Sequence, residues 1–154
     1  SSGYTRPTTF HSAGGGLVST AADWIRFATM LANDGELDGV RLLNRETARA
    51  MRTNQLGATQ GPLFWYEGAD AGQPGFSSRF DGYGWGYSVG VRLAEGEHSV
   101  AGAADEITWG GLANTTWFAD PNTGLVALVF AQYLGPDADV LDRILRGALY
   151  EPMP

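Results

Sequence analysis

The chain has 154 residues, of which 44% are hydrophobic and 18% charged, and its formal net charge is −7. This composition excludes a disordered tail, and the acidic balance argues against nucleic acid or an anionic membrane as a partner. All ten basic residues are Arg, so Gly-Lys-Ser/Thr phosphate loops, Schiff-base lysines and Ser-x-x-Lys nucleophiles cannot be built from this chain. Because there is also no Cys, disulfides and zinc–thiolate sites are excluded. We expect no metal and no other cofactor.

Two further features of the sequence are uninformative about location. No apolar run approaches 18 residues, so the sequence predicts no transmembrane helix. The first residues lack a charged segment followed by an apolar one, so export cannot be read from this chain. The localisation therefore stays open.

Residues 1–56 are predicted to form a mainly helical part. Ser19 or Thr20 is suited to cap a first helix, whose apolar residues recur at helical spacing, and residues 33–35 supply the signal that ends it. Asn44 or Arg45 begins a second, shorter helix that runs to about residue 53.

Residues 57–82 are rich in Gly, Ala and aromatic residues without a period, so we predict a long loop. Loops of this length are usually functional lids or binding loops. Phe64, Trp65 and Tyr83 belong to a group of aromatic residues in and just after this loop. Packing within the protein and the wall of a substrate-binding cleft are equally good interpretations of this group.

Residues 83–154 are predicted to form antiparallel strands and a C-terminal helix. One strand runs from residue 83 to 93, a second carries Trp109, Gly110 and Gly111, and a third is the apolar run 125–131. From Pro136 onward, apolar residues between 140 and 149 form one helical stripe that should lie on the sheet. The fold class is therefore α+β, with a three-stranded antiparallel meander covered by the last helix.

The residues Gly86-Tyr87-Ser88-Val89-Gly90 match the Gly-x-Ser-x-Gly pattern of a nucleophile elbow. An elbow needs a strand that turns sharply into a helix. Here the predicted strand continues past Ser88, so we do not assign Ser88 as a nucleophile.

The pair Gly110-Gly111 follows Trp109 in a segment otherwise rich in β-branched and aromatic residues. A backbone without side chains can point an amide N–H at negative charge that develops on a substrate, which is what an oxyanion hole requires. A β-bulge or a tight packing contact is an equally good local interpretation.

Three motifs in order point to a family. The segment 11–23 leads into the first helix, Gly35-Glu36-Leu37-Asp38-Gly39 follows, and Trp109-Gly110-Gly111 precedes Asp120-Pro121. Together they resemble the C-terminal half of class C β-lactamase-like serine hydrolases, which share the penicillin-binding-protein fold, and family VIII-type carboxylesterases in particular. The resemblance implies that residues 1–154 are the C-terminal half of one domain.

The same resemblance implies roles for residues. Trp109-Gly110-Gly111 matches the esterase form of the family's third motif, which is Lys-Thr-Gly in β-lactamases. Leu112 would then supply an oxyanion N–H, with Gly111 and Trp109 beside it in the catalytic site. Trp109 and Gly110, with the aromatic residues Phe64, Trp65 and Tyr83, would contact the substrate.

The sequence departs from the family at two motifs. Neither Ser-x-x-Lys nor Tyr-x-Asn occurs in it. We therefore expect the nucleophile on an absent N-terminal segment of the same enzyme or on a complementary chain. The implied activity is acyl transfer to water from small esters; a β-lactamase, a D-amino-acid peptidase and a non-catalytic binding module with the same fold are the alternatives.

Overall fold

The structure is a computed structural model that describes residues 7, 9–12, 14–57, 82–94, 100–111, 113–134 and 140–150. The described residues form three helices, α1 (Ala21–Ala32), α2 (Arg45–Met51) and α3 (Val140–Tyr150), and seven strands. The strands are β1 (Glu36–Leu37), β2 (Val40–Arg41), β3 (Tyr83–Trp85), β4 (Gly90–Arg92), β5 (Ile107–Gly110), β6 (Thr116–Asp120) and β7 (Leu125–Val129).

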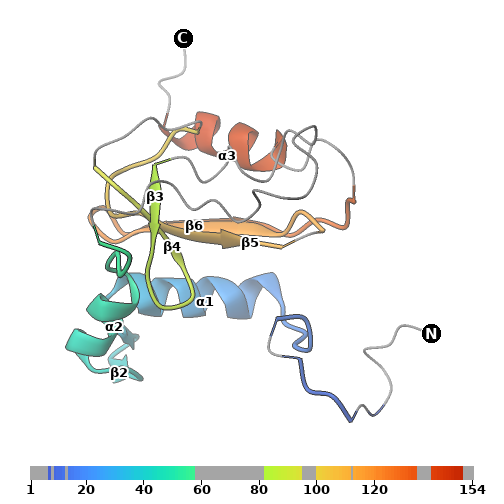
Figure 1. Cartoon of the computed structure of the whole chain (residues 1–154), viewed down its shortest axis with the longest axis horizontal. Coiled ribbons are helices and arrows are strands. Elements are labelled where there is room, and N and C mark those ends of the chain that lie inside the picture. The colour runs from blue at the N-terminus through green and yellow to red at the C-terminus, as the bar shows by residue number, and fades with distance from the viewer. Residues whose placement is uncertain are drawn as a thin grey trace.

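Strands β3 to β7 form one sheet, antiparallel at every pairing and ordered as in the sequence. The sheet lies between α1 on one face and α3 on the other (Figure 1). This architecture confirms the α+β prediction with a C-terminal helix on the sheet. Strands β1 and β2 form a separate hairpin. None of the helices within the described ranges is long and apolar enough to cross a membrane.

Local sequence signals set the starts of α1 and α2. The Thr20 hydroxyl accepts the N–H of Asp23 at 3.1 Å, and the Asn44 side chain accepts the N–H of Thr47 at 2.7 Å. Each bond satisfies one of the backbone donors that a helix N-terminus leaves unpaired. The predicted starts are confirmed, and α2 ends at Met51, two residues before the predicted end.

The predicted single strand 83–93 is wrong, because the structure divides it into β3 and β4. The N–H of Gly86 donates to the carbonyl of Val89 at 2.9 Å and closes a turn between the two strands. Ser88 lies exposed in this turn with φ +73°, so it is not in the middle of a strand. A strand follows the turn where an elbow needs a helix, so the structural context of a nucleophile elbow is still missing.

The segment 106–121 is likewise two strands, β5 and β6, joined by a turn. The register pairs Trp109 with Trp117 and Gly110 with Thr116. The meander therefore has five strands where the sequence predicted three. Of the predicted loop 57–82, residues 58–81 lie outside the described residues.

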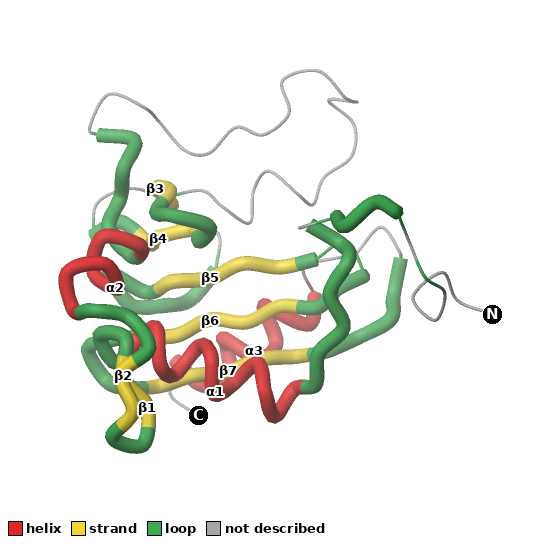
Figure 2. The backbone as a smooth tube through the Cα atoms, turned by 90° about the horizontal axis from the view of Figure 1, so that it is seen from below, coloured by secondary structure: helices red, strands yellow, loops and turns green. Residues whose placement is uncertain are grey.

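The two faces of the sheet differ in chemistry. On the α1 face, Leu31 packs against a buried apolar cluster that includes Val91, Ile107 and Trp117. Figure 2 shows α1 crossing over β6 and β7 on this face. Most of the buried polar side chains lie between the other face of the sheet and α3: Arg92, Glu106, Thr108, Thr116 and Asp120 from the sheet side, and Asp142 and Arg146 from α3.

The predicted contact of α3 with the sheet through its apolar stripe is wrong. The buried residues of α3 are Asp142 and Arg146, and Ile144 of the stripe is 65% exposed. The polar pair is buried because groups on the sheet satisfy it: Thr116 donates to Asp142 at 2.9 Å, and Arg146 donates to Glu106 at 2.6 Å. Hydrogen-bonded partners remove most of the cost of burying charge, which hydrophobic periodicity does not register.

Candidate functional site

The turn between β5 and β6 has a tightly bonded backbone. The N–H of Gly111 donates to the carbonyl of Thr115 at 2.8 Å, and the N–H of Asn114 donates to the carbonyl of Gly111 at 3.0 Å. A Cβ at position 111 would lie 2.5 Å from Thr115 Oγ1, a distance that requires a neighbour to move. A side chain at 111 would therefore force the Thr115 hydroxyl to move, and the N–H of Gly111 is already in use.

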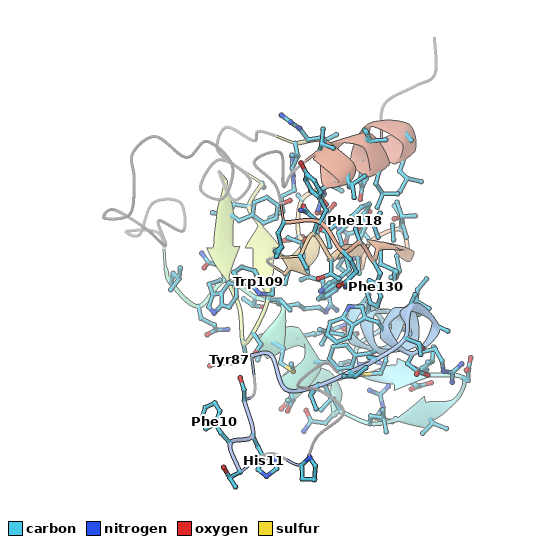
Figure 3. All side chains as sticks on the ribbon, turned by 90° about the vertical axis from the view of Figure 1, so that its right-hand side faces the viewer. Phe10, His11, Tyr87, Trp109, Phe118 and Phe130 are labelled. Atoms are coloured by element: carbon cyan, nitrogen blue, oxygen red, sulfur yellow. The ribbon has the colours of Figure 1, made fainter. Side chains whose placement is uncertain are left out.

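Trp109 holds the β5 end of this turn. Its ring is half-buried and packs on the apolar cluster under α1. It also meets the ring of Trp85 edge to face, with centroids 4.5 Å apart and planes at 70°. Figure 3 shows Trp109 beside the β3–β4 hairpin. The packing fixes the orientation of the indole next to the two glycines, and Gly110 and Gly111 are themselves only half-buried.

Three of the predicted site residues, Leu112, Phe64 and Trp65, lie outside the described residues. Their roles stay predictions. The structure does place Trp109, Gly110 and Gly111 together at the end of β5 and in the turn after it.

Tyr83 lies in a different environment from the other predicted site residues. It is 1% exposed, its hydroxyl donates to Glu106 Oε1 at 3.1 Å, and it accepts from Arg92 Nη1 at 3.1 Å. Burial raises the pKa of Tyr83 to about 12, so the phenol is uncharged at neutral pH. This burial argues against the predicted contact of Tyr83 with a substrate.

Tyr83 belongs to a buried polar cluster that links α3 to the sheet. Glu106 accepts from Arg146 Nη1 at 2.6 Å and from the Tyr150 hydroxyl at 3.0 Å, and Arg146 Nε donates to Asp142 at 2.9 Å. Burial raises the pKa of Glu106, and the charge of Arg146 opposes that rise. The members are satisfied by one another, so the cluster is structural and holds the start of β5.

Within the described ranges, no group of three or more His, Asp or Glu side chains could hold a metal ion. The groups that the β5–β6 turn presents within the described residues are backbone amides, the Trp109 indole, the Thr115 hydroxyl and the Asn114 amide. Backbone amides and aromatic rings of this kind can bind and polarise a substrate.

Sequence reasoning missed two features of this turn. Trp85 packs on Trp109, and Asn114 bonds to the segment after β7. Both contacts join residues 19 or more positions apart. Only the Gly-rich surroundings of Trp85 and the turn propensity of Asn114 hinted at them.

The described residues form an antiparallel sheet with a helix on each face, and a glycine turn follows Trp109 at the end of β5, the central strand; this arrangement agrees with a β-lactamase-like fold. The family model described as Beta-lactamase matches residues 2–151, so this chain belongs to the beta-lactamase family. Proteins with this fold are typically hydrolytic and of the serine-hydrolase type.

Two proteins of Mycobacterium tuberculosis are similar to the chain. They are Uncharacterized protein MT1414 of strain CDC 1551 / Oshkosh and Protein Rv1367c of strain ATCC 25618 / H37Rv. Each is 37% identical over 138 residues, which is 89% of this chain and 32% of the relative. The chain thus spans about a third of the length of the curated relatives it matches.

Proposed function

We propose that this chain supplies the oxyanion-binding wall of a serine hydrolase that acts by acyl transfer on small carboxylic esters. The observation that carries the proposal is the Trp109-Gly110-Gly111 turn, in a chain that belongs to the beta-lactamase family. Two glycines leave the backbone accessible to a substrate carbonyl at a half-buried position, where a hydrogen bond is stronger than in bulk water.

The proposed oxyanion donor is the backbone N–H of Leu112. The N–H of Gly111 is committed to Thr115, so the next amide along the chain is the better candidate. One such donor contributes roughly 3 kcal/mol to transition-state stabilisation in comparable sites. The second donor would come from the backbone of the nucleophile.

The nucleophile is proposed to be a Ser outside these 154 residues, on an N-terminal segment of the same enzyme or on a complementary chain. Its oxygen would attack the ester carbonyl while its proton passes to a Lys–Tyr pair on the same segment. The C–O bond to the alcohol then breaks, the alcohol takes the proton, and water releases the acyl group as the acid.

Two observations support a polypeptide partner. Strand β7 is the last strand of the described sheet, and its five residues are all half-buried. An apolar groove runs beside it, lined by Ile25 of α1, by Leu125 and Leu128 of β7, and by Leu145 and Leu149 of α3. Unpaired sheet edges next to apolar surface are normally covered.

Esters are favoured over β-lactams by the residue at 109. β-Lactam antibiotics carry a carboxylate, and a Lys at this position of the motif would attract it. Trp109 offers an uncharged aromatic surface instead, which suits a neutral ester.

The test uses the native protein, meaning the polypeptide recovered from its source with an antibody against these 154 residues. We expect it to hydrolyse short-chain nitrophenyl esters at least about 100-fold faster than a chromogenic cephalosporin, judged by kcat/KM. The Trp109→Lys variant should narrow that ratio, because it restores a cation. Faster cephalosporin or D-amino-acid peptide hydrolysis would replace the ester assignment, and the absence of any hydrolysis would favour a binding module.

A further inference from the structure

Three of the chain's ten arginines lie along one side of α2 and its C-terminal cap. Arg45, Arg49 and Arg52 stand at positions i, i+4 and i+7, which a helix places on the same face. We call them the arginine stripe. Figures 1 and 2 show α2 beside β2, and Figure 1 shows it on the other side of the sheet from α3. Like charges at this spacing repel one another, so the stripe favours an anion beside it.

The carboxylate of Asp34 meets this stripe. Arg49 donates to it through Nε at 3.1 Å and through Nη2 at 2.8 Å, and Arg52 donates to it through Nη2. Arg45 Nε lies 3.7 Å from Asp34 Oδ2, which is beyond hydrogen-bond distance. The hydrogen bond from Arg49, more than the contact with Arg52, lowers the pKa of Asp34 to about 2, so the carboxylate is ionised at neutral pH. One negative charge therefore faces three positive ones.

The other acidic side chains of this region do not compensate the stripe. Glu36 and Asp38 form their ion pairs with other arginines. Glu46 is exposed and directly follows Arg45, so it points about 100° away around the helix axis. Among the described residues, two positive charges of the stripe thus have no carboxylate of their own.

The stripe also has donors left over. The Arg45 guanidinium makes no hydrogen bond to a described residue, and its side chain is 62% exposed. Arg49 uses Nε and Nη2 on Asp34, and its side chain is 58% exposed. Arg52 Nε is buried and has no hydrogen-bond partner in the part of the chain that the structure describes. Planar guanidinium groups with open donors are suited to bind the oxygens of an anion in pairs.

We propose that the arginine stripe is a binding site for a phosphate group, either free or carried on a phosphomonoester. A phosphate group brings about two negative charges and three strong acceptor oxygens, which match the two surplus charges and the open donors. A single carboxylate would leave one of these charges uncompensated. The stripe shares no residue with the candidate active site, so the inference does not depend on the proposed hydrolase activity.

Calorimetric titration of the native protein at pH 7 and constant ionic strength tests the inference, with inorganic phosphate, phenyl phosphate and succinate as the probes. We expect saturable binding of a phosphate probe and weaker binding of succinate. Binding of phenyl phosphate alone would identify the phosphomonoester as the ligand, and binding of inorganic phosphate alone would identify the free anion. No binding of either, or equal binding of succinate, would overturn the inference, and the latter result would favour an acidic polypeptide.

Arg45→Gln should weaken phosphate binding about 10-fold, because it removes the guanidinium that has all its donors open. Arg143→Gln is the matched control, since Arg143 is an exposed arginine on α3. Its affinity for phosphate should stay within about twofold of that of the unsubstituted protein. An unchanged affinity in Arg45→Gln, or an equal loss in Arg143→Gln, would contradict a site on the stripe.

Asp34→Asn separates a binding role of the stripe from a purely structural one. The substitution removes the resident negative charge and frees donors of Arg49 and Arg52, so the affinity for phosphate should rise about fivefold. If the arginines serve only to hold Asp34, the same substitution would loosen the stripe and leave the affinity unchanged or lower. Either of those results would overturn the inference.

Discussion

Arg146 of α3 and Glu106, the residue directly before β5, form an ion pair at 2.6 Å whose side chains are 1% and 0% exposed. This pair connects the C-terminal helix to the strand that carries Trp109. The ion pair therefore helps to hold β5, and with it the candidate site, in place.

Arg146→Met should destabilise the protein strongly. It leaves Glu106 and Asp142 buried without their cation, and breaking a buried pair in this way costs about 3–5 kcal/mol. Urea denaturation at pH 7 measures the loss. Arg143→Met, on an exposed position of the same helix, should change the free energy of unfolding by less than about 0.5 kcal/mol.

The pH dependence of the Arg146→Met variant has a defined sign. Burial already raises the pKa of Glu106, and removing Arg146 takes away the larger of the two positive charges that oppose the rise, the other being Arg92. A carboxyl whose pKa is higher in the folded state loses stability as pH rises above its unfolded value. The loss of unfolding free energy in the variant, relative to the unsubstituted protein, should therefore become smaller as the pH falls from 7 to 5. A loss that does not change with pH would contradict the pairing.

Asp34 should make stability fall in acid. Arg49 donates to its carboxylate at 2.8 Å, Arg52 also bonds to it, and chiefly the Arg49 hydrogen bond lowers the Asp34 pKa to about 2. A lowered pKa gives stability that is present above pH 3.8 and is lost as pH falls toward 2. Because solvent screens this partly exposed pair, Asp34→Asn should lower the free energy of unfolding by only about 1 kcal/mol at pH 7. At pH 2 the same substitution should change it by almost nothing.

Asp38→Asn is the control for Asp34. The two residues have nearly the same left-handed backbone, φ 52° and 54°. Asp38 makes one ion pair, with Arg26 at 3.0 Å, and its side chain is 65% exposed. At pH 7 the melting temperature should fall less for Asp38→Asn than for Asp34→Asn. Equal falls in melting temperature would mean that the arginines around Asp34 do not stabilise the protein.

Gly111→Ala should lower kcat of the native protein about 10-fold where the turn shifts to relieve the contact, because the new Cβ would lie 2.5 Å from Thr115 Oγ1 and either that hydroxyl or the turn must move. Adding Thr115→Ala removes that oxygen and should restore part of the activity. Gly14→Ala is the control, since a Cβ there meets nothing within 4 Å. Initial rates with a nitrophenyl ester measure all three, and a loss unaffected by Thr115→Ala would locate the clash elsewhere.

The sequence was sufficient where the deciding interactions are local. Thr20 and Asn44 cap their helices through residues three positions away, so composition and spacing predicted both starts. Three motifs in order, the last of them Trp109-Gly110-Gly111, predicted the beta-lactamase family that the family model confirms. Its predicted site roles for Leu112, Phe64 and Trp65 concern residues outside the described ranges and stay predictions.

The sequence was insufficient where the deciding interactions are distant. The division of 83–93 into two strands depends on Ser88 adopting φ +73°, which Ser seldom does. The buried face of α3 depends on Glu106, 40 positions from Arg146. The hydrogen bond that ties the glycine turn to the segment after β7 joins Asn114 to Tyr133, 19 positions away. No local period encodes these contacts.

Fluorophosphonate labelling of the native protein, followed by mapping of the labelled peptide, tests the central claim most directly. We predict one labelled Ser, outside these 154 residues, and loss of that label in the presence of a nitrophenyl ester. Label on Ser88 or on another Ser of this chain would contradict the account, because the nucleophile would then lie in the chain that is proposed to bind only the oxyanion.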